Sequence, residues 1–422
     1  MEHTHFPKSR WYIFAAVAFA WFTFGALFIS VAPLLELIGK EFGREVGTLT
    51  IDTVALCSVA LSVGVIVSGP LIDRFGPRRL LLVSACMMTV YCILVSVLGH
   101  SVFAVVVLRL FLGLSAGPVF ACMAACSNQW FPPQEQGAFN GVGTASMSLG
   151  FAAAFVGIPI LLQQLDGDWR KLIGISAVIP ATLVVLLLFA LLIKEPREEL
   201  TSARGGEEGG EFSIALKLPV FWFGAFLIAV ASATVQSFNA LAPTYLTSAR
   251  PLGLAFDPML SGRTMSLVQF GTIAGGMSLG PIMQKLFHGS TRVMSVLGAV
   301  LCGGAVFASL LPVIQHSVTG ISLLFFLTGM FNSYLVPAAS VYIAANYPPG
   351  ILGKVFATSM GIASITGAIV VAITGAVLDK AHSFLAVFLL LFALGIVGGI
   401  AGILLKPIPT SAFDRFRTLA YV

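Results

Sequence analysis

Charged side chains within long apolar segments are the residues of this chain best placed to act on a solute. Arg109 lies within the apolar segment 102–127, and Arg263 lies within 261–286. Burying a charge in a bilayer is costly, so such a residue marks a functional site by default. At a rise of about 1.5 Å per residue, Arg109 lies roughly 10–12 Å from the nearer end of its helix. It is suited to binding a carboxylate or phosphate, or to a structural ion pair or carbonyl contact inside a helix bundle.

Neutral polar and aromatic side chains form a second candidate set. Amides and phenols can orient a ligand by hydrogen bonds in a largely apolar pocket. Each of them can instead bond to a neighbouring helix or face lipid. The predicted substrate-binding residues are Arg109, Gln236, Asn239, Gln269, Asn332, Tyr334, Phe24 and Phe28.

The sequence gives no sign of enzyme chemistry. It contains no apparent nucleophile–base arrangement, phosphate loop or metal-ligand cluster, and His100, His288, His316 and His382 stand singly near segment ends. These are the arrangements that catalysis would require. We therefore expect no catalytic residue, no metal and no cofactor, with H⁺ or Na⁺ as the candidate coupling ions.

The elements that position these residues follow from composition. The chain is 58% hydrophobic and 10% charged, whereas a soluble domain carries about 25% charged residues. A spanning helix needs about 20 apolar residues, and only helices satisfy the backbone within such runs. Twelve segments qualify: 11–35, 50–72, 79–99, 102–127, 137–163, 172–193, 219–246, 261–286, 292–313, 317–345, 353–378 and 383–405. The predicted fold class is an all-α membrane protein of twelve transmembrane helices.

Charge distribution sets the expected topology. With a cytoplasmic N-terminus, fifteen of the 23 Lys and Arg residues lie in cytoplasmic segments and six in outer ones. This bias predicts that both termini are cytoplasmic. The glycine-rich, charged stretch 194–218 is typical of a flexible linker. The predicted domains are an N-terminal six-helix bundle (1–193), a cytoplasmic linker (194–218), a C-terminal six-helix bundle (219–405) and a cytoplasmic tail (406–422). The expected location is the plasma membrane, and the composition favours the inner membrane of a bacterium.

The two halves repeat one another. Phe-Pro-Pro at 131–133 matches Tyr-Pro-Pro at 347–349, and Gly-Pro at 69–70 matches Gly-Pro at 280–281. Each pair falls at corresponding points of the two predicted bundles. Duplicated halves are a known basis of alternating access around a central site.

The loop between the second and third segments carries a family resemblance. It reads Gly69-Pro-Leu-Ile-Asp73-Arg74-Phe-Gly-Pro-Arg78-Arg79, which resembles the signature Gly-x-x-x-Asp-Arg-x-Gly-x-Arg-Arg of the major facilitator superfamily. Arg109 followed by Gly113 resembles the family's second motif. The resemblance implies two pseudo-symmetric six-helix bundles around a central cavity. It also implies a secondary active or facilitative transporter that works by rocker-switch alternating access.

The resemblance further implies a gating role for the signature loop. Asp73 would face the start of the eleventh helix, where a carboxylate meets the positive end of the helix dipole. Arg74 would pair with Asp73 or lipid phosphate, and Gly69 would permit close helix packing. Asp52 and Arg263 lie at matching points near the outer ends of the second and eighth helices. They form a candidate outer-gate salt bridge, with separate solvated caps as the alternative.

The sign of the buried charge favours a substrate class. No acidic residue lies in the middle of a predicted span, whereas Arg109 does. A small organic anion or carboxylate, moved by uniport or symport, is therefore the leading hypothesis. A proton-coupled drug or metabolite exporter is the alternative, and a non-transporting membrane sensor is a third. We expect a monomer whose partners are the solute and the lipid bilayer, without nucleic acid.

Overall fold

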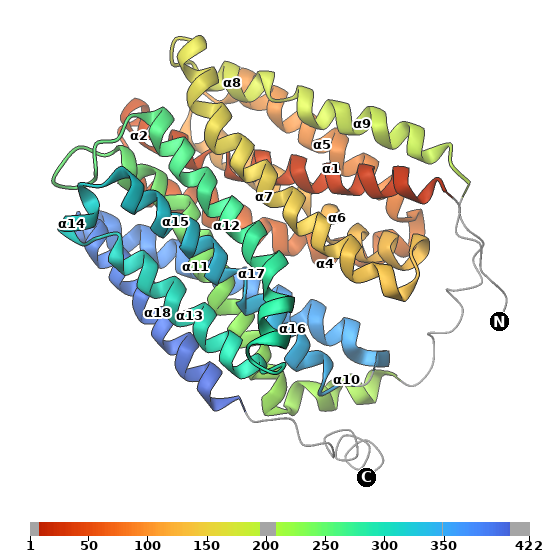
Figure 1. The fold of residues 1–422 in the computed structure, drawn as a ribbon. Helices are drawn as coiled ribbons and strands as arrows, with labels where there is room; N and C mark the ends of the chain where they lie inside the picture. Colours follow the sequence, from red (N-terminus) through yellow and green to blue (C-terminus); the bar gives the residue numbers. More distant parts are fainter. Residues whose placement is uncertain (1–7, 195–207, 348, 406–422) are drawn as a thin grey trace. The chain divides into compact units, whose positions relative to one another are not determined.

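Helices make up almost all of the computed structural model, which describes residues 8–194, 208–347 and 349–405. Figure 1 shows them as long rods joined by short loops, and no strand occurs within the described ranges. In the first part of the chain they are α1 (Arg10–Ile29), η1 (Ala32–Leu34), α2 (Leu35–Phe42), α3 (Val46–Thr50), η2 (Ile51–Ala55), α4 (Leu56–Phe75), α5 (Pro77–Leu98), α6 (Val102–Trp130), α7 (Pro133–Gln164), α8 (Trp169–Ile175) and α9 (Val178–Leu191). The remaining helices are α10 (Glu208–Lys217), α11 (Pro219–Thr247), α12 (Pro258–Lys285), α13 (Thr291–Ala308), α14 (Pro312–Gln315), α15 (Val318–Asn332), α16 (Leu335–Ala344), α17 (Pro349–Ala381) and α18 (Phe384–Leu404).

Eleven helical segments in the described part of the chain are long and apolar enough to cross a membrane. They correspond to every predicted segment except 261–286. That segment is α12, whose 28 residues exceed the roughly 20 that a bilayer core requires. Its composition is less apolar because it carries Arg263, Gln269 and several glycines and serines. The prediction of an all-α membrane fold is confirmed, and the count of twelve spans is consistent with it.

The first two spans of the chain are irregular. The first span breaks after α1, where the Ser30 hydroxyl donates to the Leu27 carbonyl at 2.8 Å and Pro33 lies in η1. A proline has no N–H to continue a helical ladder. The second span contains η2, a π-helical turn between α3 and α4. Such turns occur frequently at functional sites.

Contacts divide the chain into two compact units, which are Met1–Leu200 with Asn239–Ser266, and Thr201–Phe238 with Leu267–Val422. In the first unit α4 packs on α6, α1 on α7, and α5 on α6 and α9; in the second, α13 packs on α15 and α18. The domain boundaries inferred from sequence stay a prediction.

Glycines set the closest helix contacts in both units. A Cβ on Gly117 of α6 would overlap the backbone of Gly64 on α4, and Gly303 of α13 faces Gly395 of α18. Small residues of this kind let helix backbones approach in a membrane. Gly69 does not make such a contact, because no heavy atom lies within 4 Å of a Cβ built there. The expected close packing therefore occurs one to two helical turns earlier, at Gly64.

The predicted linker 194–218 contains α10, which differs from the flexible segment expected. Ala215 of α10 is fully buried, and its carbonyl accepts a hydrogen bond from the Tyr347 hydroxyl at 3.1 Å. Phe212, Ile214 and Leu216 pack against the same apolar core of the second unit. The physical reason is that the apolar side chains of α10 can be buried against this core. The glycine-rich part of the stretch has no such side chains. Residues 195–207 of the linker and the predicted tail 406–422 lie outside the described residues.

Candidate functional site

Arg109 lies at the centre of the candidate site in the first unit. Its side chain projects from α6 and is only 1% exposed. The guanidinium donates three hydrogen bonds to backbone carbonyls: Nε to Thr53 at 2.8 Å, Nη1 to Leu27 at 3.3 Å and Nη2 to Phe28 at 2.8 Å. One side chain therefore connects three membrane spans.

The breaks in the first two spans make these carbonyls available. The last four carbonyls of an α-helix have no partner within it, and Leu27 and Phe28 belong to the last turn of α1. A cation there is also favoured by the negative end of the helix dipole. Thr53 lies within the π-helical turn η2. Arg109 thus caps α1 and supports the irregular turn in the second span.

Aromatic side chains enclose the same region. The guanidinium carbon of Arg109 lies 5.8 Å from the centroid of the Phe28 ring. Phe24 packs against Phe28 at 5.2 Å and against Phe120 at 5.0 Å, and Trp21 lies 4.6 Å from Phe120. The structure therefore brings together three of the sequence-predicted residues: Arg109, Phe24 and Phe28.

No carboxylate pairs with Arg109 among the residues that the structure describes. The ion pairs of the first unit lie toward the ends of the helices: Arg10–Glu135, Lys40–Glu36, Arg170–Glu41 and Lys171–Asp168. The buried neighbours of the guanidinium are neutral, and they include the phenol of Tyr91. Carbonyl dipoles stabilise the cation, but its unit charge has no counter-charge within the span.

The predicted residues of the second unit are all in contact with their own helices or neighbours. Gln236 Nε2 donates to Ser232 Oγ at 2.7 Å, beside Gly367 on α17. The Tyr334 and Ser278 hydroxyls lie 3.2 Å apart. Asn332 Oδ1 faces the Cys302 thiol of α13 at 4.0 Å. These contacts hold Tyr334 and Asn332 within the unit, and their predicted role in substrate binding stays a prediction.

The two remaining amides are buried in the described chain. Asn239 is 3% exposed and Gln269 is 2% exposed. A buried amide requires hydrogen-bond partners. The interior of the protein can provide such partners, whereas lipid cannot. Both residues therefore stay in the candidate set.

The predicted gating residues lie at the ends of helices. Asp73 and Arg74 are exposed in the last turn of α4, and Arg74 stacks on its neighbour Phe75 at 5.3 Å. Asp52 is half-buried and Arg263 is exposed. No ion pair joins Asp52 to Arg263 in the described chain, so their role at an outer gate stays a prediction, as does the alternative of separate caps. The first unit instead places Thr247 Oγ1 of α11 3.3 Å from Glu36 Oε2 of α2.

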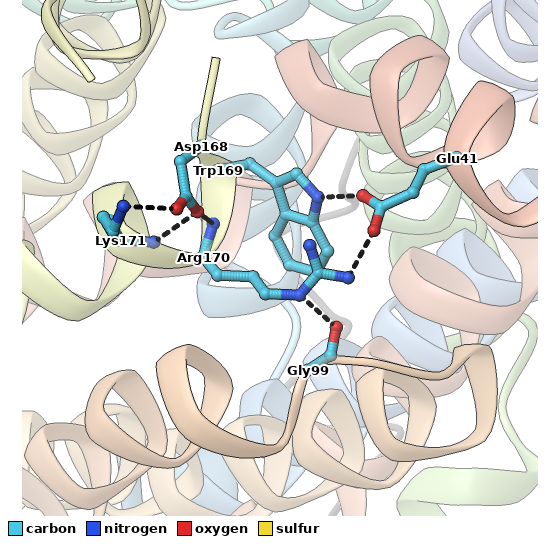
Figure 2. Close-up of polar contacts among 6 residues, drawn as sticks. All are labelled: Glu41, Gly99, Asp168, Trp169, Arg170 and Lys171. Carbon is cyan, nitrogen blue, oxygen red and sulfur yellow. Dashed lines mark hydrogen bonds and ion pairs between the residues drawn. The ribbon is translucent and has the colours of Figure 1, made fainter. Parts of the chain in front are cut away.

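One polar cluster was not predicted from sequence, and Figure 2 shows it. Glu41 of α2 accepts two hydrogen bonds, from Trp169 Nε1 at 2.7 Å and from Arg170 Nη2 at 2.5 Å. Arg170 Nε also donates to the Gly99 carbonyl at the end of α5 at 2.7 Å, and its guanidinium stacks on Trp169 at 4.4 Å. The cluster therefore ties the end of the first span to the loop that follows α5 and to the start of α8.

Asp168 completes this cluster as the N-cap of α8. Its carboxylate accepts the backbone N–H groups of Arg170 and Lys171, each at 3.1 Å, and pairs with Lys171 Nζ at 3.0 Å. The hydrogen bond from the Lys171 backbone N–H is the main reason that the pKa of Asp168 lies below its usual value. The sequence contained the signal, an aspartate directly before an apolar helix.

Buried arginine, apolar spans and glycine-packed helices together describe a polytopic helical membrane protein with a polar centre. The model of the Major Facilitator Superfamily matches residues 13–325. The chain belongs to this superfamily, and it is a membrane transporter.

Three known proteins show what this chain is similar to. It is 26% identical over 227 residues to "Probable nitrate/nitrite transporter NarK2" of Mycobacterium tuberculosis, a match that covers 51% of this chain and 54% of that protein. It is 23% identical over 399 residues to "Probable sulfoacetate transporter SauU" of Cupriavidus necator, covering 90% of each. Among solved structures, a D-xylose-proton symporter matches with a TM-score of 0.77 at 15% identity, covering 94% of this chain and 98% of that one. The last match shows the shared fold alone.

Proposed function

We propose that this transporter moves a small organic anion, such as a carboxylate or sulfonate, by rocker-switch alternating access of its two halves. The observation that carries the proposal is the charge of Arg109, which is 1% exposed and has no carboxylate partner in the described chain. Carbonyl dipoles accept three of its N–H groups without cancelling its unit charge. In the low dielectric of the bundle, that charge attracts an anion and repels a cation.

The printed names of the relatives support the same class. Nitrate, nitrite and sulfoacetate are all anions, and they are the solutes named for the mycobacterial and Cupriavidus proteins. Because one of these two matches spans about half of its relative, a particular substrate does not follow from it. The common property of negative charge is what we carry over.

Arg109 acts on the anion mainly through its field in this proposal. A guanidinium has five N–H groups, and three of those of Arg109 donate hydrogen bonds to backbone carbonyls. Neutral donors are then needed to orient the solute. The amides of Gln236, Asn239 and Gln269 are proposed for that role.

The proposal includes topology and coupling. Both termini are placed on the cytoplasmic side of a bacterial inner membrane, which the bias of Lys and Arg between the loops supports. Asp73 and Arg74 are proposed to act in gating at that side. Coupling to H⁺ or Na⁺ and a monomeric working state complete the proposal.

Ligand-dependent thermal stabilisation of the purified protein tests the substrate class. A ligand that binds the folded state raises the melting temperature by mass action. The panel contains carboxylates, sulfonates, sugars and organic cations, applied to wild type, Arg109→Lys and Arg109→Gln. Comparing each protein with and without ligand separates lost binding from lost stability.

The expected result is a stabilising anion whose effect falls in Arg109→Lys and disappears in Arg109→Gln. Lysine keeps the charge but cannot bridge three carbonyls, whereas glutamine loses both. If organic cations or neutral lipophiles stabilise all three proteins equally, the anion proposal fails. The proton-coupled drug or metabolite exporter then becomes the better-supported function.

A further inference from the structure

A basic cavity lies at one end of the first unit, away from Arg109. It has a volume of about 280 Å³ and is lined by Phe75, Gly76, Arg78, Arg79 and Leu191. It is formed where α4 ends, α5 begins and α9 ends. Two arginines in so small a lining give the cavity a strong positive potential, which is suited to an anion.

The two arginines have different roles in this cavity. Arg78 is 7% exposed, and its Nη1 donates to the carbonyls of Ala190 at 2.7 Å and Ile193 at 2.6 Å. Its guanidinium also stacks over Trp130 at 5.5 Å. Arg78 therefore fixes the end of α9 and contributes a fixed charge. Arg79 is exposed and lies at the third position of α5, so its guanidinium is able to reach a ligand.

The backbone adds to the positive potential. Gly76 joins α4 to α5 with a φ of 80°, a left-handed conformation that glycine adopts without strain. Gly76 and the first-turn residues Arg78 and Arg79 line the cavity, so the N-terminus of the 22-residue helix α5 borders it. The positive end of the helix dipole favours a phosphate at such an end.

The surfaces beside the cavity distinguish a lipid from a soluble anion. Arg79 begins an exposed stripe along α5 whose members recur every three or four residues: Val83, Cys86, Val90, Ile93 and Val97. On α9, which packs against α5, the exposed apolar residues are Val178, Val185, Leu188 and Phe189, and Leu192 follows the end of the helix. Leu192 is 81% exposed directly after the lining residue Leu191. The basic cavity thus lies at one end of two apolar stripes that cross the membrane.

We propose that this cavity binds the phosphate of an anionic phospholipid whose acyl chains lie along the exposed faces of α5 and α9. Arg79 contacts the phosphate, Arg78 and the α5 N-terminus supply fixed positive potential, and the two stripes contact the chains. Basic pockets between spanning helices are known to bind lipid head groups in this manner. The site does not depend on which solute the transporter carries.

Native mass spectrometry of the delipidated protein in a neutral detergent tests the site. The probes are dioleoylphosphatidylglycerol, dioleoylphosphatidylcholine with the same chains, and inorganic phosphate without chains. The proteins are wild type, Arg79→Gln, Arg79→Lys and Arg292→Gln. Arg292 is an exposed arginine in the first turn of α13, so its variant makes the same charge change at another helix start, outside the cavity.

The expected result is that Arg79→Gln weakens the tightest phosphatidylglycerol site about fivefold, since one arginine near the surface contributes about 1 kcal/mol. Arg79→Lys and Arg292→Gln retain that affinity within about twofold, and phosphatidylcholine binds more weakly to all four proteins. Equal affinities in Arg79→Gln and Arg292→Gln would overturn the site. Binding of inorganic phosphate that depends on Arg79 and equals the lipid's would overturn the lipid as its ligand.

Discussion

Replacing Glu41 by alanine is the most informative test of the cluster in Figure 2. The change removes the acceptor of two hydrogen bonds, from Trp169 Nε1 and Arg170 Nη2. Trp169 is 2% exposed, so its N–H would be left buried without an acceptor, at a cost of about 1–3 kcal/mol. Arg170 and Glu41 are partly exposed, so their ion pair adds only about 0.2–1 kcal/mol. We expect the free energy of unfolding to fall by about 2–3 kcal/mol.

A double-mutant cycle isolates the part due to the buried indole. Trp169→Phe removes the N–H donor while retaining most of the aromatic packing. In that background Glu41→Ala should cost about 1–2 kcal/mol less than in the wild type. The control is Lys40→Ala, whose 74% exposed side chain pairs with Glu36 and should change stability by at most about 0.5 kcal/mol.

Reversible unfolding in mixed detergent micelles gives the free energies directly. The reasoning would be refuted if Glu41→Ala cost no more than Lys40→Ala. It would also be refuted if the cost of Glu41→Ala were the same with and without the Trp169 N–H, because the buried donor would then contribute nothing.

Three further changes test other parts of the structure. Gly117→Ala should destabilise the first unit by about 1–3 kcal/mol in the same assay, because the added Cβ overlaps the backbone of Gly64; unchanged stability would show that α4 and α6 can separate at no cost. Gln284 follows Gly280 by four residues, as Asp73 follows Gly69, so it is the corresponding position of the second half. Asp73→Asn should lower the rate of solute uptake more than Gln284→Ala, because only Asp73 carries a charge to place at a helix end; equal effects would remove Asp73 from gating. The lowered pKa of Asp168 means that its contribution to stability is complete above the unfolded-state pKa of about 3.9 and is lost as pH falls through the folded-state value. Asp168→Asn should therefore flatten the loss of melting temperature between neutral and acid pH, and an identical slope in both proteins would contradict the assignment.

The spans and the central arginine could be predicted because each rests on a local property of the sequence. Apolar runs of sufficient length have few alternatives to spanning helices, and the cost of a buried charge singles out Arg109. The helix α12 was also predicted, although it carries Arg263 and Gln269, because its length and its place in the repeat indicated a helix.

A carbonyl contact was one of the expected alternatives for Arg109, but the particular carbonyls could not be predicted from the sequence. Every residue has such a carbonyl, and only helix breaks make those of Leu27, Phe28 and Thr53 available. Pro33 was a visible signal for the break in the first span. The π-helical turn around Thr53 has no comparable marker in the sequence.

Two other features could not be predicted from the sequence: the pairs of residues far apart in the chain, and the side of a helix that faces its neighbour. Glu41 and Arg170 are 129 residues apart, and neither position indicates the other. Gly69 was chosen for close packing by its motif, whereas Gly64 makes that contact. Motif membership does not tell which side of a helix faces its neighbour in the bundle.

Uptake of a labelled organic anion into proteoliposomes tests the central claim most directly. The anion is the one that stabilises the purified protein best, and the comparison includes wild type, Arg109→Lys, Arg109→Gln and empty liposomes. The account predicts saturable uptake by the wild type that unlabelled anions inhibit and organic cations do not, with reduced uptake in Arg109→Lys and none in Arg109→Gln. Uptake that cations inhibit as strongly as anions, or that persists unchanged in folded Arg109→Gln, would contradict it.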